Sequence, residues 1–336
     1  MDSTLALYAN FGIAFGLTGA FLYFAFLDDG GGGDEPMDTE ADGGGDDGRP
    51  DDTDEPSENT ILIEDLIATA PTLDEDASPD VTSSFATAET VQGGDGADTL
   101  DGRDDTLSRT YQGGAGDDVI LAAKLTDVAD GGEGDDTIRP AAGDDLSYGG
   151  AGNDVVTDGF GRDIHFGGEG DDSLSGGANG DFLQGGAGAD SLIGGGGSDY
   201  LAGGSDNDLI DGRASQGDAP KDDGLDSLFG GTGDDQLFLD NGDQATGGDG
   251  ADRFTIDEAA AGDGVVTITD FTAGEDDIAI EYTGAQGVEE PTVTLSPLDA
   301  GVQIALGDQP IATLAGVEEI DPAAVTLVDK SEEEES

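Results

Sequence analysis

Apolar residues are distributed along this chain in three patterns that predict different structures. Leu5 to Leu27 is a run of 23 residues without a charged side chain, and as a helix it would reach roughly 35 Å, enough to cross a bilayer core. Residues 28 to 59 are a mixture of Gly, Asp, Glu and Pro with almost no apolar residue, which predicts a solvated, self-repelling linker. The apolar cluster at 61 to 70 has the spacing of one or two helical turns and stops at Pro71.

The third pattern is a nine-residue period that runs from Gly113 to Phe238. Its frame holds for 126 residues, or fourteen nonapeptides, of which GGEGDDSLS at 167 to 175 is one. Thirteen of the fourteen sixth positions are aspartate, so the period is not an accident of composition. The eighth positions that carry a large aliphatic residue are Ile120, Ile138, Val156, Leu174, Leu183, Leu192, Leu201, Ile210, Leu228 and Leu237. Related copies stand out of frame at Gly93 and Gly247.

Each nonapeptide is expected to form one turn and one short strand. The glycines at its head permit backbone angles that are closed to other residues, and the last three residues suit a strand whose middle side chain faces inward. Asn179 replaces one such glycine, which is tolerable because Asn enters the left-handed region readily. Two nonapeptides then make a flattened coil of about 18 residues, and stacking at about 4.8 Å gives seven coils and a roll roughly 34 Å long.

Composition changes this picture through charge. The chain has 78 acidic and 10 basic residues, a net charge of −68, which argues against nucleic acid or an anionic membrane surface as a partner and points to cations. Each coil buries only about two aliphatic side chains, too few to offset its conformational entropy, and stacked carboxylates repel one another. A cation must therefore enter the stack.

Calcium fits the available ligands best. It accepts six to eight oxygens from carboxylates and carbonyls in flexible geometry, whereas magnesium requires a stricter octahedron. Zinc and copper favour histidine or cysteine, and the chain has one histidine and no cysteine. We therefore expect folding to be linked to the binding of several Ca²⁺ ions.

The repeated phrase resembles the GGxGxDxUx nonapeptide of RTX (repeats-in-toxin) proteins, a calcium-binding repeat. The resemblance covers residues 93 to 255, and it continues in VTITDFTAGEDDIAIEY at 266 to 282 and in the strand-like segment 302 to 328. It implies an all-β fold: a parallel β-roll closed by C-terminal β-strands, with calcium shared between turns 18 residues apart. It also implies export from a Gram-negative bacterium in an unfolded state and folding outside the cell.

The expected metal ligands are the aspartates of the repeats. They are Asp98, Asp118, Asp136, Asp154, Asp172, Asp181, Asp190, Asp199, Asp208, Asp226, Asp235 and Asp252. Turns that begin at 113, 131, 149, 167, 185 and 203 keep their paired glycines and should form well-filled sites on one side of the roll. On the other side, the copies at 122, 140, 158 and 212 depart from the phrase, so only Asp181, Asp199 and Asp235 are expected to bind there.

The chain is predicted to divide into five parts. They are an anchor or signal at 1–27, an acidic linker at 28–90, the calcium-binding roll at 91–255, a β-strand cap at 256–330 and an acidic tail at 331–336. Residues 5–27 fit an uncleaved membrane anchor because a basic start and a good cleavage site are both missing. A cleaved signal peptide and a buried soluble helix are the alternatives.

No catalytic motif is found. The sequence contains neither a His-Glu-x-x-His zinc helix, as in a serralysin-like protease domain, nor a Gly-x-Ser-x-Gly elbow, and His165 at an apolar eighth position is expected to be a core imidazole. We expect a calcium-binding, non-enzymatic protein of the outward-facing cell envelope. The alternatives are a calcium-dependent adhesin or surface-layer module that binds glycans or cells and, with less support, a fragment of a secreted toxin or hydrolase.

Overall fold

The computed structural model describes residues 89–213, 224–240, 242–257, 264–284 and 291–331. The predicted anchor at 5–27 and the predicted helix at 61–70 lie outside these residues. Within the described ranges the chain is all β, with one 3-10 turn at Pro322–Ala324 and no α-helix. None of the described segments is a helix long and apolar enough to span a bilayer.

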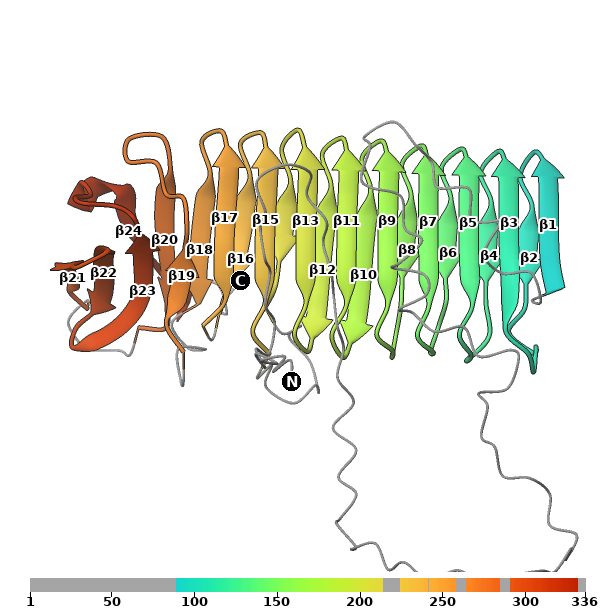
Figure 1. Cartoon of the computed structure of the whole chain (residues 1–336), viewed down its shortest axis with the longest axis horizontal. Coiled ribbons are helices and arrows are strands. Elements are labelled where there is room, and N and C mark those ends of the chain that lie inside the picture. Colours follow the sequence, from blue (N-terminus) through green and yellow to red (C-terminus); the bar gives the residue numbers. More distant parts are fainter. Residues whose placement is uncertain (1–88, 214–223, 241, 258–263, 285–290, 332–336) are drawn as a thin grey trace, which may run out of the picture. The chain divides into compact units, whose positions relative to one another are not determined.

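The strands form two sheets, and successive strands alternate between them from β1 to β21 (Figure 1). The 13-stranded sheet contains, in spatial order, β1 (Glu89–Asp95), β3 (Arg109–Ala115), β5 (Val128–Glu133), β7 (Leu146–Ala151), β9 (Ile164–Glu169), β11 (Phe182–Ala187), β13 (Tyr200–Ser205), β15 (Ser227–Thr232), β17 (Gln244–Asp249), β19 (Val266–Ile268), β23 (Gln309–Ala315), β22 (Gly301–Leu306) and β21 (Val293–Leu298). The 11-stranded sheet contains β2 (Thr99–Asp101), β4 (Val119–Leu121), β6 (Thr137–Arg139), β8 (Val155–Thr157), β10 (Ser173–Ala178), β12 (Ser191–Gly196), β14 (Leu209–Asp211), β16 (Gln236–Leu239), β18 (Arg253–Asp257), β20 (Asp277–Tyr282) and β24 (Val325–Asp329). This is the predicted parallel β-roll.

Strand pairing follows the predicted period. Leu183 of β11 pairs with Leu201 of β13, 18 residues on, and Leu174 of β10 pairs with Leu192 of β12. All ten aliphatic eighth positions are at most 1% exposed, so the alternation inside the nonapeptide fixes which side chains form the core. The core is one cluster of buried, mostly aliphatic side chains that includes these ten.

The turns use the special backbone angles that the glycines permit. In the turn that begins at Gly167, the second and fourth residues, Gly168 and Gly170, have φ of 124° and 117°. Asn179 occupies the equivalent fourth position of the next copy at φ 81°, which confirms the expectation for this residue. The first glycine of each copy is not in the left-handed region, so it is required for a different reason, which the site explains.

One part of the predicted frame is wrong. Leu201 pairs with Leu228 and Asp211 with Phe238, which are 27 residues apart instead of 18. The pairing is therefore offset by nine additional residues after Asp211, and every later turn lies on the side opposite to the one predicted. The copy that begins at 212 lacks the sixth-position aspartate, and its residues 214–220 lie outside the described residues.

The C-terminal strands continue the sheets, as the resemblance implied. β19 joins β17 in parallel, and β23 joins β19. β21, β22 and β23 then form an antiparallel meander, while β24 pairs with β20 and ends the other sheet. The last repeat strands, β17 and β18, therefore pair with β19 and β20, which lack the nonapeptide pattern.

Candidate metal centre

The sixth-position aspartates lie where the chain leaves each turn and enters a strand. They form two stacks, one along each edge of the roll. The first-side stack contains Asp98, Asp118, Asp136, Asp154, Asp172, Asp190, Asp208, Asp235 and Asp252, each directly before a strand of the 11-stranded sheet. The second-side stack contains Asp127, Asp145, Asp163, Asp181, Asp199, Asp226 and Asp243, each directly before a strand of the 13-stranded sheet.

From Asp118 on, one oxygen of each first-side carboxylate binds the coil before it. The backbone N–H of Asp136 donates to Oδ1 of Asp154 at 2.7 Å, and the N–H of Asp154 donates to Oδ1 of Asp172 at 2.7 Å. The same bond recurs along the second side, where the N–H of Asp163 donates to Oδ1 of Asp181 at 2.8 Å. The aspartate therefore fixes the stacking of coils through Oδ1 and leaves Oδ2 for another partner.

The second oxygen is buried and has no hydrogen-bond partner among the described residues. This holds for Oδ2 of Asp118, Asp136, Asp145, Asp154, Asp163, Asp172, Asp181, Asp190, Asp208, Asp235 and Asp252. A buried carboxylate oxygen without a partner is costly, and here the cost recurs in nearly every turn. A cation beside Oδ2 would remove it.

The first glycine of a turn faces this oxygen. A Cβ added to Gly131 would overlap Oδ2 of Asp136 and lie 2.6 Å from the carbonyl oxygen of Gly149 in the next turn. At Gly167 it would overlap Oδ2 of Asp172. A carboxylate oxygen from one turn and a carbonyl oxygen from the next therefore converge at a place that any side chain would fill.

Burial also shifts the protonation of these groups. Desolvation, followed by the charges of the stacked neighbours, raises the pKa of Asp136 to about 7 and that of Asp172 and Asp208 to about 8. On the second side it raises the pKa of Asp181 to about 9. Without a cation, the ionised form of these stacked carboxylates is therefore disfavoured at neutral pH.

These observations fit calcium. The convergent groups are all oxygens, one carboxylate and one carbonyl per gap, and Ca²⁺ accepts such a mixture at about 2.3 to 2.6 Å. The structure shows two of the six to eight oxygens that Ca²⁺ takes. Sites in the gaps would use the aspartates predicted from the sequence and also Asp145 and Asp163, which were not predicted.

The two sides differ at one gap, that of Asp127, whereas Asp145 and Asp163 of the second side, which were not expected to bind, have the same buried Oδ2 without a partner as the first-side aspartates. Ala122, Pro140 and Asp158 stand where the first glycine is expected on the second side, and Oδ2 of Asp127 accepts the N–H of Ala123 at 3.1 Å. The gap at Asp127 therefore differs from the first-side gaps, since its carboxylate has a partner within the chain.

The placement of Asp235 on the second side was wrong. The N–H of Asp208 donates to Oδ1 of Asp235 at 2.8 Å, so Asp235 continues the first-side stack. Asp226 continues the second side, where it accepts the N–H of Asp199. The nine additional residues after Asp211 exchange the two sides.

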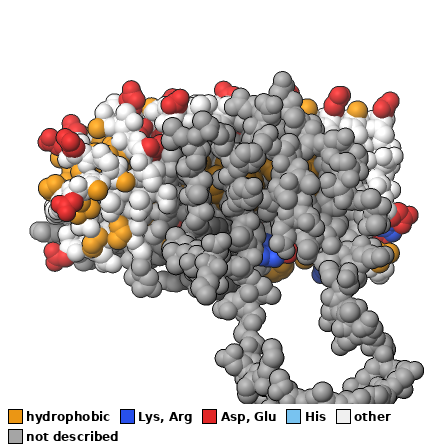
Figure 2. All heavy atoms as spheres, viewed as in Figure 1, with side chains coloured by type: hydrophobic (Ala, Val, Ile, Leu, Met, Phe, Trp, Pro, Cys, Tyr) orange, Lys and Arg blue, Asp and Glu red, His pale blue; other side chains and the backbone are white. Residues whose placement is uncertain are grey.

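A second ladder was missed from the sequence. Fifth-position residues run along the outside of the first-side turns, where the N–H of Asn153 donates to Asp135 Oδ1 and the N–H of Asp171 donates to Asn153 Oδ1, both at 2.8 Å. Figure 2 shows acidic side chains along the edge where these turns lie. The signal was the recurrence of Asp or Asn at fifth positions 117, 135, 153, 171, 207 and 234.

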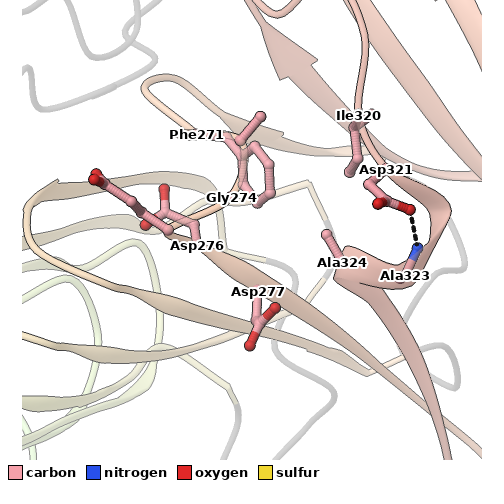
Figure 3. A pocket seen from close by; sticks show the side chains of 10 residues that line it. Phe271, Gly274, Asp276, Asp277, Ile320, Asp321, Ala323 and Ala324 are labelled. Carbon is pink, nitrogen blue, oxygen red and sulfur yellow. Dashed lines mark hydrogen bonds between the residues drawn. The ribbon is translucent and has the colours of Figure 1, made fainter.

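A pocket in the C-terminal part has a different character (Figure 3). Phe271, Ile320 and Ala324 line it together with acidic residues. Asp321 caps the 3-10 turn by accepting the N–H of Ala323 at 2.9 Å, and Asp276 accepts the N–H groups of Asp252 and Thr272. These two carboxylates already have partners, so the stacked turns are the better candidate for a metal centre.

Comparisons with known proteins agree with this geometry. The family described as "RTX calcium-binding nonapeptide repeat (4 copies)" matches residues 84–107, 110–147, 125–156, 141–174, 175–210 and 222–243. The extracellular lipase LipA from Serratia marcescens is among the solved structures that match, at 16% identity and a TM-score of 0.22, over 66% of this chain and 42% of that chain. The match spans less than half of that lipase. No curated protein matches the chain.

Proposed function

Because the repeat region of this chain belongs to the RTX calcium-binding nonapeptide repeat family, we propose that Ca²⁺ binding between stacked turns completes the folding of the roll. RTX repeats imply calcium binding in a β-roll. The proposal adds that folding and binding are one event and that the folded roll has a structural role and no catalytic one.

One observation carries this proposal: the repeated, buried Oδ2 without a partner. A chain with 78 acidic residues and 10 basic ones cannot supply enough side-chain cations to neutralise these carboxylates. A ligand that binds only the folded state shifts the folding equilibrium toward it. We therefore expect the roll to be weakly stable or unfolded in chelator and stable in calcium.

We further propose that the roll works outside the cytoplasm. Extracellular calcium modules bind with dissociation constants of about 10⁻⁴ to 10⁻³ M, and sites of that affinity stay empty at cytosolic calcium levels. The uncharged segment 5–27 supports attachment to a membrane. Deleting residues 1–30 tests the attachment: the full chain should fractionate with membranes and the shortened chain should not.

The test of calcium-linked folding uses residues 88–336, which form a compact unit. Far-UV circular dichroism is followed during a calcium titration, with magnesium in the control titration. Strand signal should rise cooperatively with calcium and stay low with magnesium. A full strand signal in excess chelator would show that the roll folds without the ion.

One observation favours the alternative of an adhesive surface module. Tyr148, Phe166, Phe182 and Tyr200 stack along neighbouring strands of the 13-stranded sheet, with ring centroids 5.0 to 5.8 Å apart. These rings are only partly buried, and aromatic faces also bind sugars. Calcium-dependent binding to a glycan panel that is lost in Phe182→Ser would support this function, and absence of binding would leave the rings a packing role.

A further inference from the structure

The copy DGFGRDIHF at 158 to 166 departs from the repeat at two positions that the fold brings together. Asp158 stands where most copies have their first glycine, and it is the only acidic residue at this position among the fourteen in-frame copies. His165 stands at the apolar eighth position, and it is the only histidine in the chain. In the structure, Nε2 of His165 lies 3.5 Å from Oδ2 of Asp158.

The two side chains meet inside the roll beside a third ligand. His165 lies in β9 between Ser147 of β7 and Leu183 of β11 and is 0% exposed. One carboxylate oxygen of Asp158, one of Asp163 and a ring nitrogen of His165 all lie within 4.8 Å of one another. Within the described part of the chain, Oδ2 of both aspartates and both ring nitrogens of His165 have no hydrogen-bond partner.

We propose that Asp158, Asp163 and His165 form a site for one transition-metal cation of the Zn²⁺ type, distinct from the all-oxygen calcium sites. Imidazole nitrogen suits Zn²⁺, Cu²⁺ and Ni²⁺, whereas Ca²⁺ takes oxygen ligands. A tetrahedral ion with bonds of about 2.1 Å holds its ligand atoms roughly 3.4 Å apart, close to the 3.5 Å between His165 and Asp158.

The surroundings favour a cation at this point. Burial raises the pKa of Asp145 and of Asp181 in the neighbouring turns to about 9, and the charges of Asp158 and Asp163 add to this, so four carboxylates share one region. Burial lowers the pKa of His165 to about 4, so the imidazole is neutral near pH 7 and has a lone pair to donate. The structure confirms that His165 is a core imidazole, and the proposal adds a ligand role to it.

The site also accounts for the lost glycine. A Cβ at the first position of an ordinary turn would overlap Oδ2 of the turn's own aspartate, as it does at Gly176 and Gly194 in the next two turns on this side. Asp158 brings its own carboxylate into that place. At this turn, a mixed nitrogen and oxygen site therefore replaces the all-oxygen gap of an ordinary turn.

The experiment uses the full chain saturated with calcium and freed of transition metals, with Co²⁺ as a visible probe. Circular dichroism first confirms that each protein is folded, which separates failure of this site from failure of calcium-linked folding. We expect one equivalent of Co²⁺ to bind with the strong visible absorption of a tetrahedral nitrogen and oxygen site, and Zn²⁺ to displace it.

Two variants restore the ordinary repeat and so should keep the fold. His165→Leu and Asp158→Gly are each expected to lower Co²⁺ affinity by more than about 100-fold, beyond the usual cost of losing an outer-shell partner. The exposed acid variant Asp171→Asn is the control and should bind Co²⁺ as the wild type does. Absence of the absorption in the calcium-loaded wild type, or its persistence in His165→Leu, overturns the proposal.

A second readout needs no variant. Because the chain has one histidine, ¹⁵N-labelled histidine gives a single pair of imidazole resonances in the calcium-loaded protein. Zn²⁺ should shift the ligating nitrogen strongly at one equivalent. Resonances that stay unchanged would show that a buried water or nothing at all occupies the place between these side chains, which also overturns the proposal.

Discussion

Gly167→Ala tests why the first glycine of the repeat is required. Its backbone is outside the left-handed region, so the substitution causes no conformational strain of its own. The new Cβ would overlap Oδ2 of Asp172 and lie 2.6 Å from the carbonyl oxygen of Gly185. Because Gly185 is held within β11, the carboxylate of Asp172 is the group that must move.

The cost can be estimated from the bond that the carboxylate makes. Asp172 accepts the N–H of Asp154 at 2.7 Å, and a hydrogen bond to a charged group contributes about 1.5 to 3 kcal/mol. We expect Gly167→Ala to lower the free energy of unfolding by about this amount in saturating calcium. The calcium concentration at the folding midpoint should also rise, because Oδ2 is displaced from its gap.

Urea denaturation followed by circular dichroism measures the change. Gly196→Ala is the matched control: its Cβ would meet nothing within 4 Å, so we expect a change within about 0.5 kcal/mol. If both alanines had equal effects, the explanation would be general loss of backbone freedom, and the convergence of oxygens at Gly167 would have no energetic meaning.

Three further predictions concern the core, the two sides and pH. Leu183→Ala should lower the free energy of unfolding by about 2 to 5 kcal/mol because Leu183 is fully buried, whereas truncation of the exposed Leu209 should cost far less; equal losses in urea denaturation would contradict the assignment of the core. Replacing Asp154 and Asp172 by alanine should weaken calcium binding in titration calorimetry much more than Asp127→Ala does, and equal effects would remove the distinction between the sides. Without metal, strand signal should be greatest near pH 4 and fall as pH rises from about 6 to 9, since burial holds the folded-state pKa of the stacked aspartates above the unfolded value. With calcium the trend should reverse, because protons compete with calcium for the same oxygens, and a metal-free signal that rises with pH would contradict this reasoning.

The repeat unit was predictable from the sequence because one short phrase determines its own turn and strand. The eighth-position aliphatics are buried where the period places them, and Asn179 takes the left-handed angle of the glycine it replaces. The stacking role of Asp Oδ1 was not predictable, since it depends on a backbone N–H one coil away. The periodicity identified the aspartates but not the separate roles of Oδ1 and Oδ2.

The remaining features could not be predicted because they depend on how distant parts of the chain pair. Counting in nines carried the frame through the copy at 212, although Gly217 had already replaced its aspartate, and Asp235 was assigned to the wrong side. The meeting of Asp158 and His165 required both side chains to be placed, because one follows a strand and the other lies within the next. Pairs of departures within one copy are the signal that would have revealed it.

The most direct test of calcium between the turns is a crystal structure grown in calcium, with anomalous diffraction used to locate the ions. We predict ions in the gaps of the first-side stack, within about 2.3 to 2.6 Å of Oδ2 of aspartates such as Asp154, Asp172 and Asp190. Ions bound only to the exposed fifth-position acids, with Oδ2 of the stacked aspartates still unligated, would contradict the account.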